Sequence, residues 1–268
     1  MKSAKNDYEI ILHIGMQRTG STFLQEELFS NISEINRIEK NKKIYMLIKN
    51  IEKHNEKNLN DMIKKEFDEY FSQNKINLIS DENISCRMWT KEDNRYKRIY
   101  KIKHFFPNAK IIFGIRNKTN LLISWYKKYV ICGGVLSFQD FQKNIININK
   151  INYDPYIEHL YELFGKKNVF VYKFENMKED IHKLVNNICS FIGVKTPNFN
   201  NVYRNIGYSF WQLKISLLIN RFFKTSFNPE GIFPLGYELH PHRKIFQSAF
   251  FPLKLRGNKV TIENLRKI

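Results

Sequence analysis

The segment from Gly15 to Thr22 constrains the fold more than any other part of the sequence. It reads Gly-Met-Gln-Arg-Thr-Gly-Ser-Thr and lies between the apolar run Tyr8–Ile14 and a helical pattern over Ser21–Ser30. A buried strand, a glycine loop and a helix N-terminus form an anion site, because backbone N–H groups converge there and the helix dipole favours negative charge. The sequence therefore predicts a phosphate-binding loop.

This loop has the spacing of a Walker loop but lacks the Walker lysine. Ser21 stands at the lysine position, and Arg18 supplies a cation earlier in the loop. The Walker lysine reaches the β- and γ-phosphates of a triphosphate, and the hydroxyl after it holds magnesium. We therefore expect a shorter 5′-phosphoryl ligand without a metal, bound by Arg18, Thr19, Gly20, Ser21 and Thr22. The alternative is a strand-to-helix turn whose hydroxyls cap the helix and bind no ligand.

Three further apolar runs follow the first one, at Ile76–Ile79, Ala109–Ile115 and Asn168–Lys173. Short strands that are apolar on both faces and alternate with helices are typical of a parallel sheet covered on both sides. We expect helices at 91–106, after Thr119, at 178–192 and at 211–223. With 268 residues, the chain is long enough to bury a sizeable core.

The sequence thus predicts an α/β fold: a single domain over residues 1–268 with a central parallel sheet. A P-loop-like phosphate loop follows the first strand, and helices cover both faces. Residues 33–73 are expected to form a helical insertion, and residues 208–268 a basic, aromatic C-terminal segment.

The net charge of +18 favours acidic partners such as nucleic acid, anionic lipid or acidic glycan. Between Glu39 and Glu69 the lysines alternate with acids, as on a solvated helical face. From Pro241 to Ile268, seven Lys or Arg residues stand against the single acid Glu263. That tail is the best candidate for a polyanion contact, with solvated surface lysine as the alternative.

The compartment is also constrained by the sequence. No run of about 18 apolar residues is present, and the N-terminus lacks a signal peptide's long apolar centre. The three cysteines have no C-x-x-C spacing, which favours free thiols over disulfides or a zinc site. We expect a cytoplasmic protein, with the inner face of the membrane as a candidate location.

A second anion site is indicated by Arg116 and Ser124. Arg116 directly follows the apolar run Ala109–Ile115, where a parallel sheet presents its ligand-binding edge. Ser124 lies eight residues further on, in the predicted helix. An arginine at a strand end and a helical serine can grip one phosphate together, the arginine bidentately.

Three segments, Ile10–Leu24, Arg116–Ser124 and Phe174–Asp180, resemble in order and spacing the signatures of sulfotransferases that use 3′-phosphoadenosine 5′-phosphosulfate (PAPS). The resemblance covers most of residues 8–195 and suggests a bacterial, carbohydrate-type member. It implies that the first loop binds the 5′-phosphosulfate and that Arg116 and Ser124 bind the 3′-phosphate. Two positions depart from the family pattern. Arg18 replaces a lysine, and Phe174 replaces a tyrosine near the adenine.

By the same resemblance, Arg18 stabilises the charge on the leaving bisphosphate, and a base activates the incoming hydroxyl. Glu82 and Asp81 follow the run Ile76–Ile79 at the ligand edge, and carbohydrate-type members use a glutamate in a similar place. We expect Glu82 to be the base, with Asp81 as its rival. Either acid can instead cap the next helix. Four histidines are weaker candidates: His13, His104, His240 and His242.

The sequence therefore favours a sulfotransferase that modifies a hydroxyl of a glycan or glycolipid, with peripheral contact to an anionic membrane surface. A nucleotide or small-molecule kinase is the alternative with the same fold, but Ser21 at the lysine position disfavours it. A basic nucleic-acid-binding protein is the second alternative. It would require a clustered basic and aromatic face, whereas outside the tail the charge is scattered.

Overall fold

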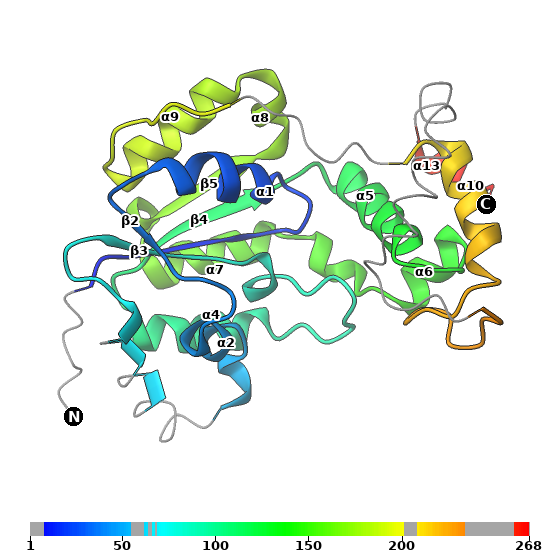
Figure 1. Ribbon diagram of the computed structural model, residues 1–268, viewed down its shortest axis with the longest axis horizontal. Coiled ribbons are helices and arrows are strands. Elements are labelled where there is room, and N and C mark those ends of the chain that lie inside the picture. Colours follow the sequence, from blue (N-terminus) through cyan, green and yellow to red (C-terminus); the bar gives the residue numbers. More distant parts are fainter. Residues whose placement is uncertain are drawn as a thin grey trace. The chain divides into compact units, whose positions relative to one another are not determined.

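The computed structural model describes residues 8–54, 62–63, 66–67, 69–200, 208–233 and 260–267. The chain divides into two compact units (Figure 1). The first unit comprises Met1–Asn117 and Asn152–Val202, and the second comprises Lys118–Ile151 and Tyr203–Ile268. The predicted basic tail from Pro241 lies almost entirely outside the described residues, as do His240 and His242.

The first unit is built on a sheet of five parallel strands in the order β2-β3-β1-β4-β5. The strands are β1 (Ile10–Gly15), β2 (Ile35–Arg37), β3 (Ile76–Ser80), β4 (Lys110–Ile115) and β5 (Val169–Lys173). β1, β3 and β4 are buried almost throughout, as expected for strands that are covered on both faces. The four predicted apolar strands are therefore confirmed.

Helices cover both faces of this sheet, as predicted. On one face lie α1 (Ser21–Phe23), which continues into the π-helix η1 (Leu24–Leu28), α8 (Phe174–Glu179) and α9 (Ile181–Ile192) (Figure 1). On the other face lie α4 (Arg95–Phe105) and α7 (Asp154–Phe164). α9 buries Leu184, Val185 and Ile188 against Ile11 and Ile112 of the sheet. The α/β fold class is thus confirmed.

The segment 33–73 differs from the helical insertion that the sequence suggests. It contains α2 (Lys43–Lys49) and the 3₁₀-helix η3 (Ile51–Lys53), but also the edge strand β2. Only Ile35 of that strand is buried, so it lacks the apolar run that marks the other strands. Pairing with β3 fixes its conformation, and that pairing is not visible in the local sequence.

The second unit contains four described α-helices, α5 (Lys118–Ile131), α6 (Phe138–Asn144), α10 (Phe210–Asn220) and α13 (Ile262–Leu265), and the 3₁₀-helix η5 (Ile148–Ile151). The Asn220 side chain donates hydrogen bonds to the carbonyls of Val130 and Gly134, 2.8 and 2.9 Å away, which ties α10 to the end of α5. Throughout the described ranges, no helix combines the length and apolar character needed to cross a membrane.

A chain of buried polar side chains crosses the sheet of the first unit. The Nδ1 atom of His13 lies 2.7 Å from the Ser80 hydroxyl, and its Nε2 atom lies 3.3 Å from the Tyr172 hydroxyl. The side-chain amide of Gln25 donates to the same Ser80 hydroxyl over 2.8 Å. Burial lowers the pKa of His13 from 6.5 to about 3, helped by the charges of Arg37 and Lys40. The imidazole is therefore neutral in the folded protein.

This neutral histidine predicts acid sensitivity. The unfolded chain binds a proton at His13 near pH 6.5 but the folded chain only near pH 3, so stability present above pH 6.5 is lost as the pH falls through this window. The histidine contributes a slope of about 1.4 kcal/mol per pH unit. Urea unfolding between pH 7 and 5 measures it. His13→Gln should flatten the slope, and an unchanged slope would contradict a neutral buried imidazole.

Candidate functional site

The predicted site residues of the first unit follow the carboxyl ends of neighbouring strands. β1 leads into the Gly15–Thr22 loop, β3 into Asp81 and Glu82, β4 into Arg116, and β5 into Phe174. β1 lies between β3 and β4. The strands that follow it in the chain, β2 and β3, lie on one side, and the later strands β4 and β5 lie on the other, so the strand order reverses at β1. In open α/β sheets, ligands bind at this kind of switch point, outside the carboxyl ends of the strands.

The loop leaves β1 where that strand touches β4. A Cβ on Gly15 would lie 2.4 Å from the Gly114 nitrogen, and the φ angle of Gly15 is +136°. The Met16 N–H donates to the Gly114 carbonyl over 2.8 Å. The Ser85 hydroxyl donates to the Gly15 carbonyl over 2.6 Å and accepts from the Gly15 N–H over 2.8 Å. Contacts on both sides thus fix the start of the loop.

Arg18 and Gly20 give the loop its tight turn. Arg18 is the one non-glycine residue in the described ranges with a positive φ, at 73°. Such a conformation costs about 1–2 kcal/mol in an ordinary residue. Gly20 has φ +89°, and a Cβ there would lie 2.6 Å from the Met177 sulfur and 3.2 Å from the Phe174 ring. Positive φ angles at Arg18 and Gly20 turn the backbone sharply, and a loop of this kind can point its N–H groups at an anion.

The hydroxyls of the loop do not all point the same way. Thr19 is buried, and its hydroxyl donates to the Met16 carbonyl over 2.7 Å, so it supports the loop from within. This orientation differs from the predicted one, in which Thr19 faces a ligand. The Ser21 hydroxyl donates to the Glu82 carboxylate, and Thr22 is half-buried on α1.

Arg116 turns toward the loop. Its Nη1 donates to the Arg18 carbonyl over 3.1 Å, and its guanidinium lies 4.5 Å from the centre of the Phe174 ring. Its Nε is buried and has no hydrogen-bond partner within the described part of the chain. Burial lowers the pKa of Arg116, the Glu175 carboxylate raises it, and the Arg18 charge lowers it further. Two neighbouring guanidiniums beside a glycine loop have the charge and the donors that suit an anion.

Phe174 lies among cations and the loop backbone. The Lys178 ammonium lies 5.2 Å from its ring centre, in addition to the Arg116 guanidinium. Its ring also packs next to Gly20. An aromatic face beside an anion-binding loop suits stacking of a nucleotide base.

The two candidate acids have different surroundings. Asp81 is 1% exposed, accepts from the Asn83 N–H over 2.9 Å as the N-cap of the 3₁₀-helix η4 (Glu82–Ile84), and pairs with Lys49 at 3.5 Å. Glu82 is half-buried and accepts from Ser21 of the phosphate loop. Asp81 thus has the capping role, whereas Glu82 lies against the loop.

α2 of the insertion approaches these acids. Lys49 lies at its end and pairs with Asp81, as stated above. Burial raises the pKa of Tyr45, and the nearby carboxylates of Asp81 and Glu82 add to the increase. Residues of the insertion therefore lie beside Glu82.

The remaining predicted residues that the structure describes are Ser124, His13 and His104. Ser124 is buried on α5 in the second unit. Since Ser124 and Arg116 belong to different units, their joint grip on one phosphate stays a prediction. His13 has both ring nitrogens engaged in the interior, and His104 is exposed on the last turn of α4.

Four residues that contribute to the site were not identified from the sequence: Gln17, Asn83, Ser85 and Glu175. The Gln17 amide donates to the Asn83 amide oxygen over 2.8 Å and so joins the loop to η4. Ser85 brackets Gly15, and the Glu175 carboxylate accepts from the Asn117 N–H over 3.2 Å. Asn83 and Glu175 stand inside segments already singled out, whereas no local pattern marks Ser85. Among the described residues, no group of three or more His, Cys, Asp and Glu could hold a metal ion.

A model of the sulfotransferase domain family matches residues 9–211. Sulfotransferase 4A1 of Homo sapiens is 28% identical over 93 residues, covering 32% of this chain and 32% of that protein. The 3-beta-hydroxysteroid sulfotransferase of Cavia porcellus is 29% identical over 118 residues, covering 40% of this chain and 41% of that protein. The matches thus span less than half the length of these curated relatives.

A solved sulfotransferase structure from Alicyclobacillus acidocaldarius superposes with a TM-score of 0.54 at 16% identity, over 79% of this chain and 92% of that chain. It shares the fold. The family match extends from β1 through the phosphate loop, Arg116 and the Phe174 segment to the start of α10. This protein belongs to the sulfotransferase domain family.

Proposed function

We propose that this protein transfers a sulfuryl group from PAPS to a hydroxyl group. The observation that carries the proposal is the position of Arg116 beside Arg18 at the phosphate loop. Among the described residues, the buried Nε of Arg116 has no hydrogen-bond partner. A second phosphate next to the loop would accept a hydrogen bond from that Nε. A nucleotide phosphorylated on both sides of its ribose has such a group.

The residues present fit this co-substrate. Arg18 and the loop backbone around Gly20 would hold the 5′-phosphosulfate, Arg116 would hold the 3′-phosphate, and Phe174 would line the adenine. The co-substrate supplies an activated sulfuryl group. Arg18 would stabilise negative charge that develops on the departing phosphate, because it belongs to the loop and its charge acts next to Arg116. Glu82 takes the proton from the acceptor hydroxyl.

Ser21 and Glu82 together disfavour the kinase alternative. In a Walker loop, the position of Ser21 carries a cation for the terminal phosphates. Here that side chain donates to a carboxylate instead. A carboxylate at this point would repel a γ-phosphate but is suited to accept a proton from a neutral hydroxyl.

We propose a carbohydrate or glycolipid hydroxyl as the acceptor. The neighbours of Glu82 are mainly polar: the amides of Gln17 and Asn83 and the Lys49–Asp81 ion pair. Amides and carboxylates at a half-exposed surface suit the hydroxyls of a sugar. Transfer of labelled sulfate from PAPS to a panel of glycans, glycolipids and phenolic steroids tests the acceptor. Labelling of the steroids alone would contradict this choice.

Arg116→Ala should weaken binding of PAPS and of its desulfated product, 3′-phosphoadenosine 5′-phosphate (PAP). The loss of a charged hydrogen-bond partner costs about 1.5–3 kcal/mol, or about 10- to 150-fold in affinity. Titration calorimetry without metal measures it. Lys97→Ala removes an exposed cation on α4 and serves as the charge-matched control. Binding of ATP with magnesium in place of PAP would overturn the proposed function.

Glu82→Gln should retain PAP affinity and reduce turnover by about 10²- to 10⁴-fold, the usual contribution of a general base. The amide keeps the shape of the side chain but cannot accept the proton. Asp81→Asn is the comparison, because asparagine also caps helices and should preserve most of the activity. If Asp81→Asn loses turnover and Glu82→Gln does not, Asp81 is the base.

We also propose that α10 contacts an anionic membrane surface. Trp211, Leu218 and Phe222 are 48%, 57% and 48% exposed, and the cations Lys214 and Arg221 are exposed beside them. No acidic residue occurs between Tyr208 and Pro229. Exposed aromatic and aliphatic side chains among cations are typical of helices that lie at a membrane interface.

Vesicles of phosphatidylcholine with phosphatidylserine test this contact. Trp211→Ser with Leu218→Ser should reduce binding about tenfold or more, because both side chains lose apolar area that the membrane would bury. Tyr100→Ser with Ile148→Ser alters two side chains of similar exposure, 63% and 47%, and is the control. Equal binding to vesicles of phosphatidylcholine alone would contradict the role of the charge.

A further inference from the structure

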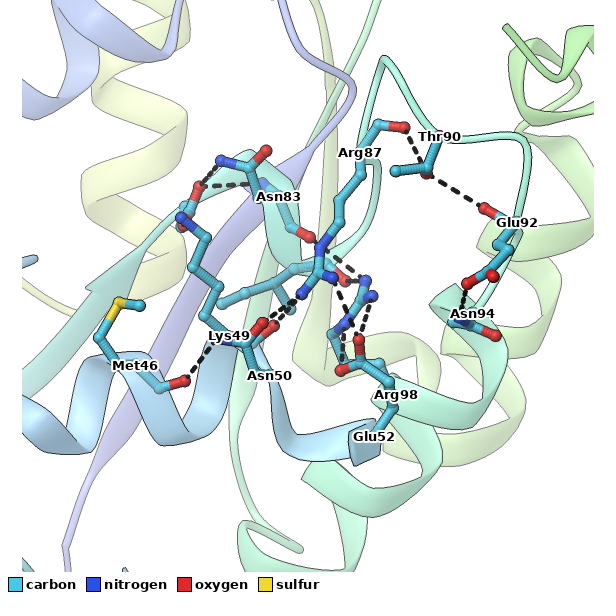
Figure 2. Close-up of polar contacts among 12 residues, drawn as sticks. Met46, Lys49, Asn50, Glu52, Asn83, Arg87, Thr90, Glu92, Asn94 and Arg98 are labelled. Atoms are coloured by element: carbon cyan, nitrogen blue, oxygen red, sulfur yellow. Dashed lines mark hydrogen bonds and ion pairs between the residues drawn. The ribbon is translucent and has the colours of Figure 1, made fainter. Parts of the chain in front are cut away.

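Three charged side chains, Glu52, Arg87 and Arg98, form a network (Figure 2). It contacts η4, the 3₁₀-helix that begins at Glu82. Arg98 of α4 donates from Nε to Glu52 Oε2 over 2.9 Å and from Nη2 to Glu52 Oε1 over 3.0 Å. The two side chains are only 3% and 4% exposed. This is a bidentate ion pair in the interior of the first unit.

The remaining nitrogen of Arg98 binds the backbone of η4. Its Nη1 donates to the Ile84 carbonyl over 2.6 Å and to the Asn83 carbonyl over 3.2 Å. These two carbonyls directly follow Glu82 in the chain. The Arg98 guanidinium therefore holds the turn on which Glu82 stands.

Arg87 connects the same network to the insertion. Its Nη1 lies 3.3 Å from Glu52 Oε1, and its Nη2 donates to the Lys49 carbonyl over 2.7 Å and to the Asn50 side chain over 2.9 Å (Figure 2). Lys49 ends α2, and Glu52 lies in η3. Glu52 thus joins the end of α2 to η4 through two arginines.

Buried ion pairs add little net stability, since the cost of removing two charges from water offsets their attraction. Burial alone would raise the pKa of Glu52, but the hydrogen bonds and charge of Arg98, together with Arg87, outweigh it and leave the pKa lowered. The carboxylate is therefore ionised, and the charges keep a fixed geometry. Such a network is better explained by the positions that it fixes than by the stability that it adds.

The positions that it fixes are those of the phosphate loop and the proposed base. η4 and its C-cap Ser85 also contact the loop, through Glu82 with Ser21, Asn83 with Gln17, and Ser85 with Gly15. A shift of η4 would therefore move the Glu82 carboxylate relative to the loop. A displacement of about 1 Å can reduce a rate by about 100-fold.

We propose that Glu52, Arg98 and Arg87 are positioning residues, which hold Glu82 at the site of transfer and set its place relative to α2. The proposal rests on the proposed function of Glu82. None of the three residues needs to touch the co-substrate, so their substitution should change turnover and leave the affinity for PAP nearly unchanged.

Arg98→Lys and Arg95→Lys form a matched pair of variants. Both arginines are buried on α4, 3% and 5% exposed, but Arg95 pairs with Asp93 and stacks on Tyr156. A lysine keeps the charge and loses the fork that binds Glu52 and the two carbonyls together. We expect Arg98→Lys to reduce kcat by about 10- to 100-fold with little change in the KM for PAPS. Arg95→Lys should leave kcat nearly unchanged at a similar loss of stability.

Two further measurements separate a positioning role from a general loss of structure. Amide hydrogen exchange over residues 82–86 should accelerate in Arg98→Lys and not in Arg95→Lys. If Arg98 acts through Glu82, the double variant with Glu82→Gln should lose no more turnover than Glu82→Gln alone. If Arg98→Lys does not fold, Arg87→Lys, at the 22% exposed corner of the network, takes its place.

Equal exchange and equal kcat in the two lysine variants would overturn the positioning role while Glu82→Gln still abolishes turnover. Retained turnover in Glu82→Gln would instead overturn the proposed base. In that case, exchange that is faster in Arg98→Lys but not in Arg95→Lys would show that the network still holds η4. The network would then have no role in catalysis through Glu82. The two failures are therefore distinguishable.

Discussion

The site depends on how closely β1 and β4 approach each other at Gly15 and Gly114. The hydrogen bond from the Met16 N–H to the Gly114 carbonyl closes this contact. A side chain at Gly15 would overlap the β4 backbone, so the strands could not stay paired to their carboxyl ends. Because they do, the phosphate loop and Arg116 leave the sheet side by side, and the Arg116 guanidinium reaches the loop carbonyl of Arg18.

Positive and negative side chains lie on different sides of the phosphate loop. Arg18 and Arg116 gather on the β4 and β5 side of the loop, next to Phe174 and Lys178. Asp81 and Glu82 lie on the β3 side, with the Glu82 carboxylate held by Ser21. A group that carries phosphates is attracted to the first side, and a group that must lose a proton is attracted to the second. The loop between them is where transfer is proposed to occur.

The sequence predicts the parts of this arrangement that are local. Apolar runs mark β1, β3, β4 and β5, and because parallel strands present their carboxyl ends at one edge, the residues that follow them meet. Long-range geometry escapes such reasoning. β2 is defined by its pairing with β3, and the inward turn of the Thr19 hydroxyl depends on the Met16 carbonyl. α4 carries several basic residues, and the sequence does not distinguish Arg98 from the others. Its role becomes visible only from its hydrogen bond to Glu52.

The insertion between β1 and β3 is the part for which family resemblance says least, yet it supplies Glu52 to the network that contacts η4. α2 ends in that network, and its Tyr45 and Lys49 lie near the two acids. A segment that both lies beside the proposed base and fixes its position can alter acceptor choice without any change in the loop or Arg116. Under the proposed function, recognition of the donor would therefore depend on the contact of β1 with β4, and recognition of the acceptor on how α2 and η4 are joined.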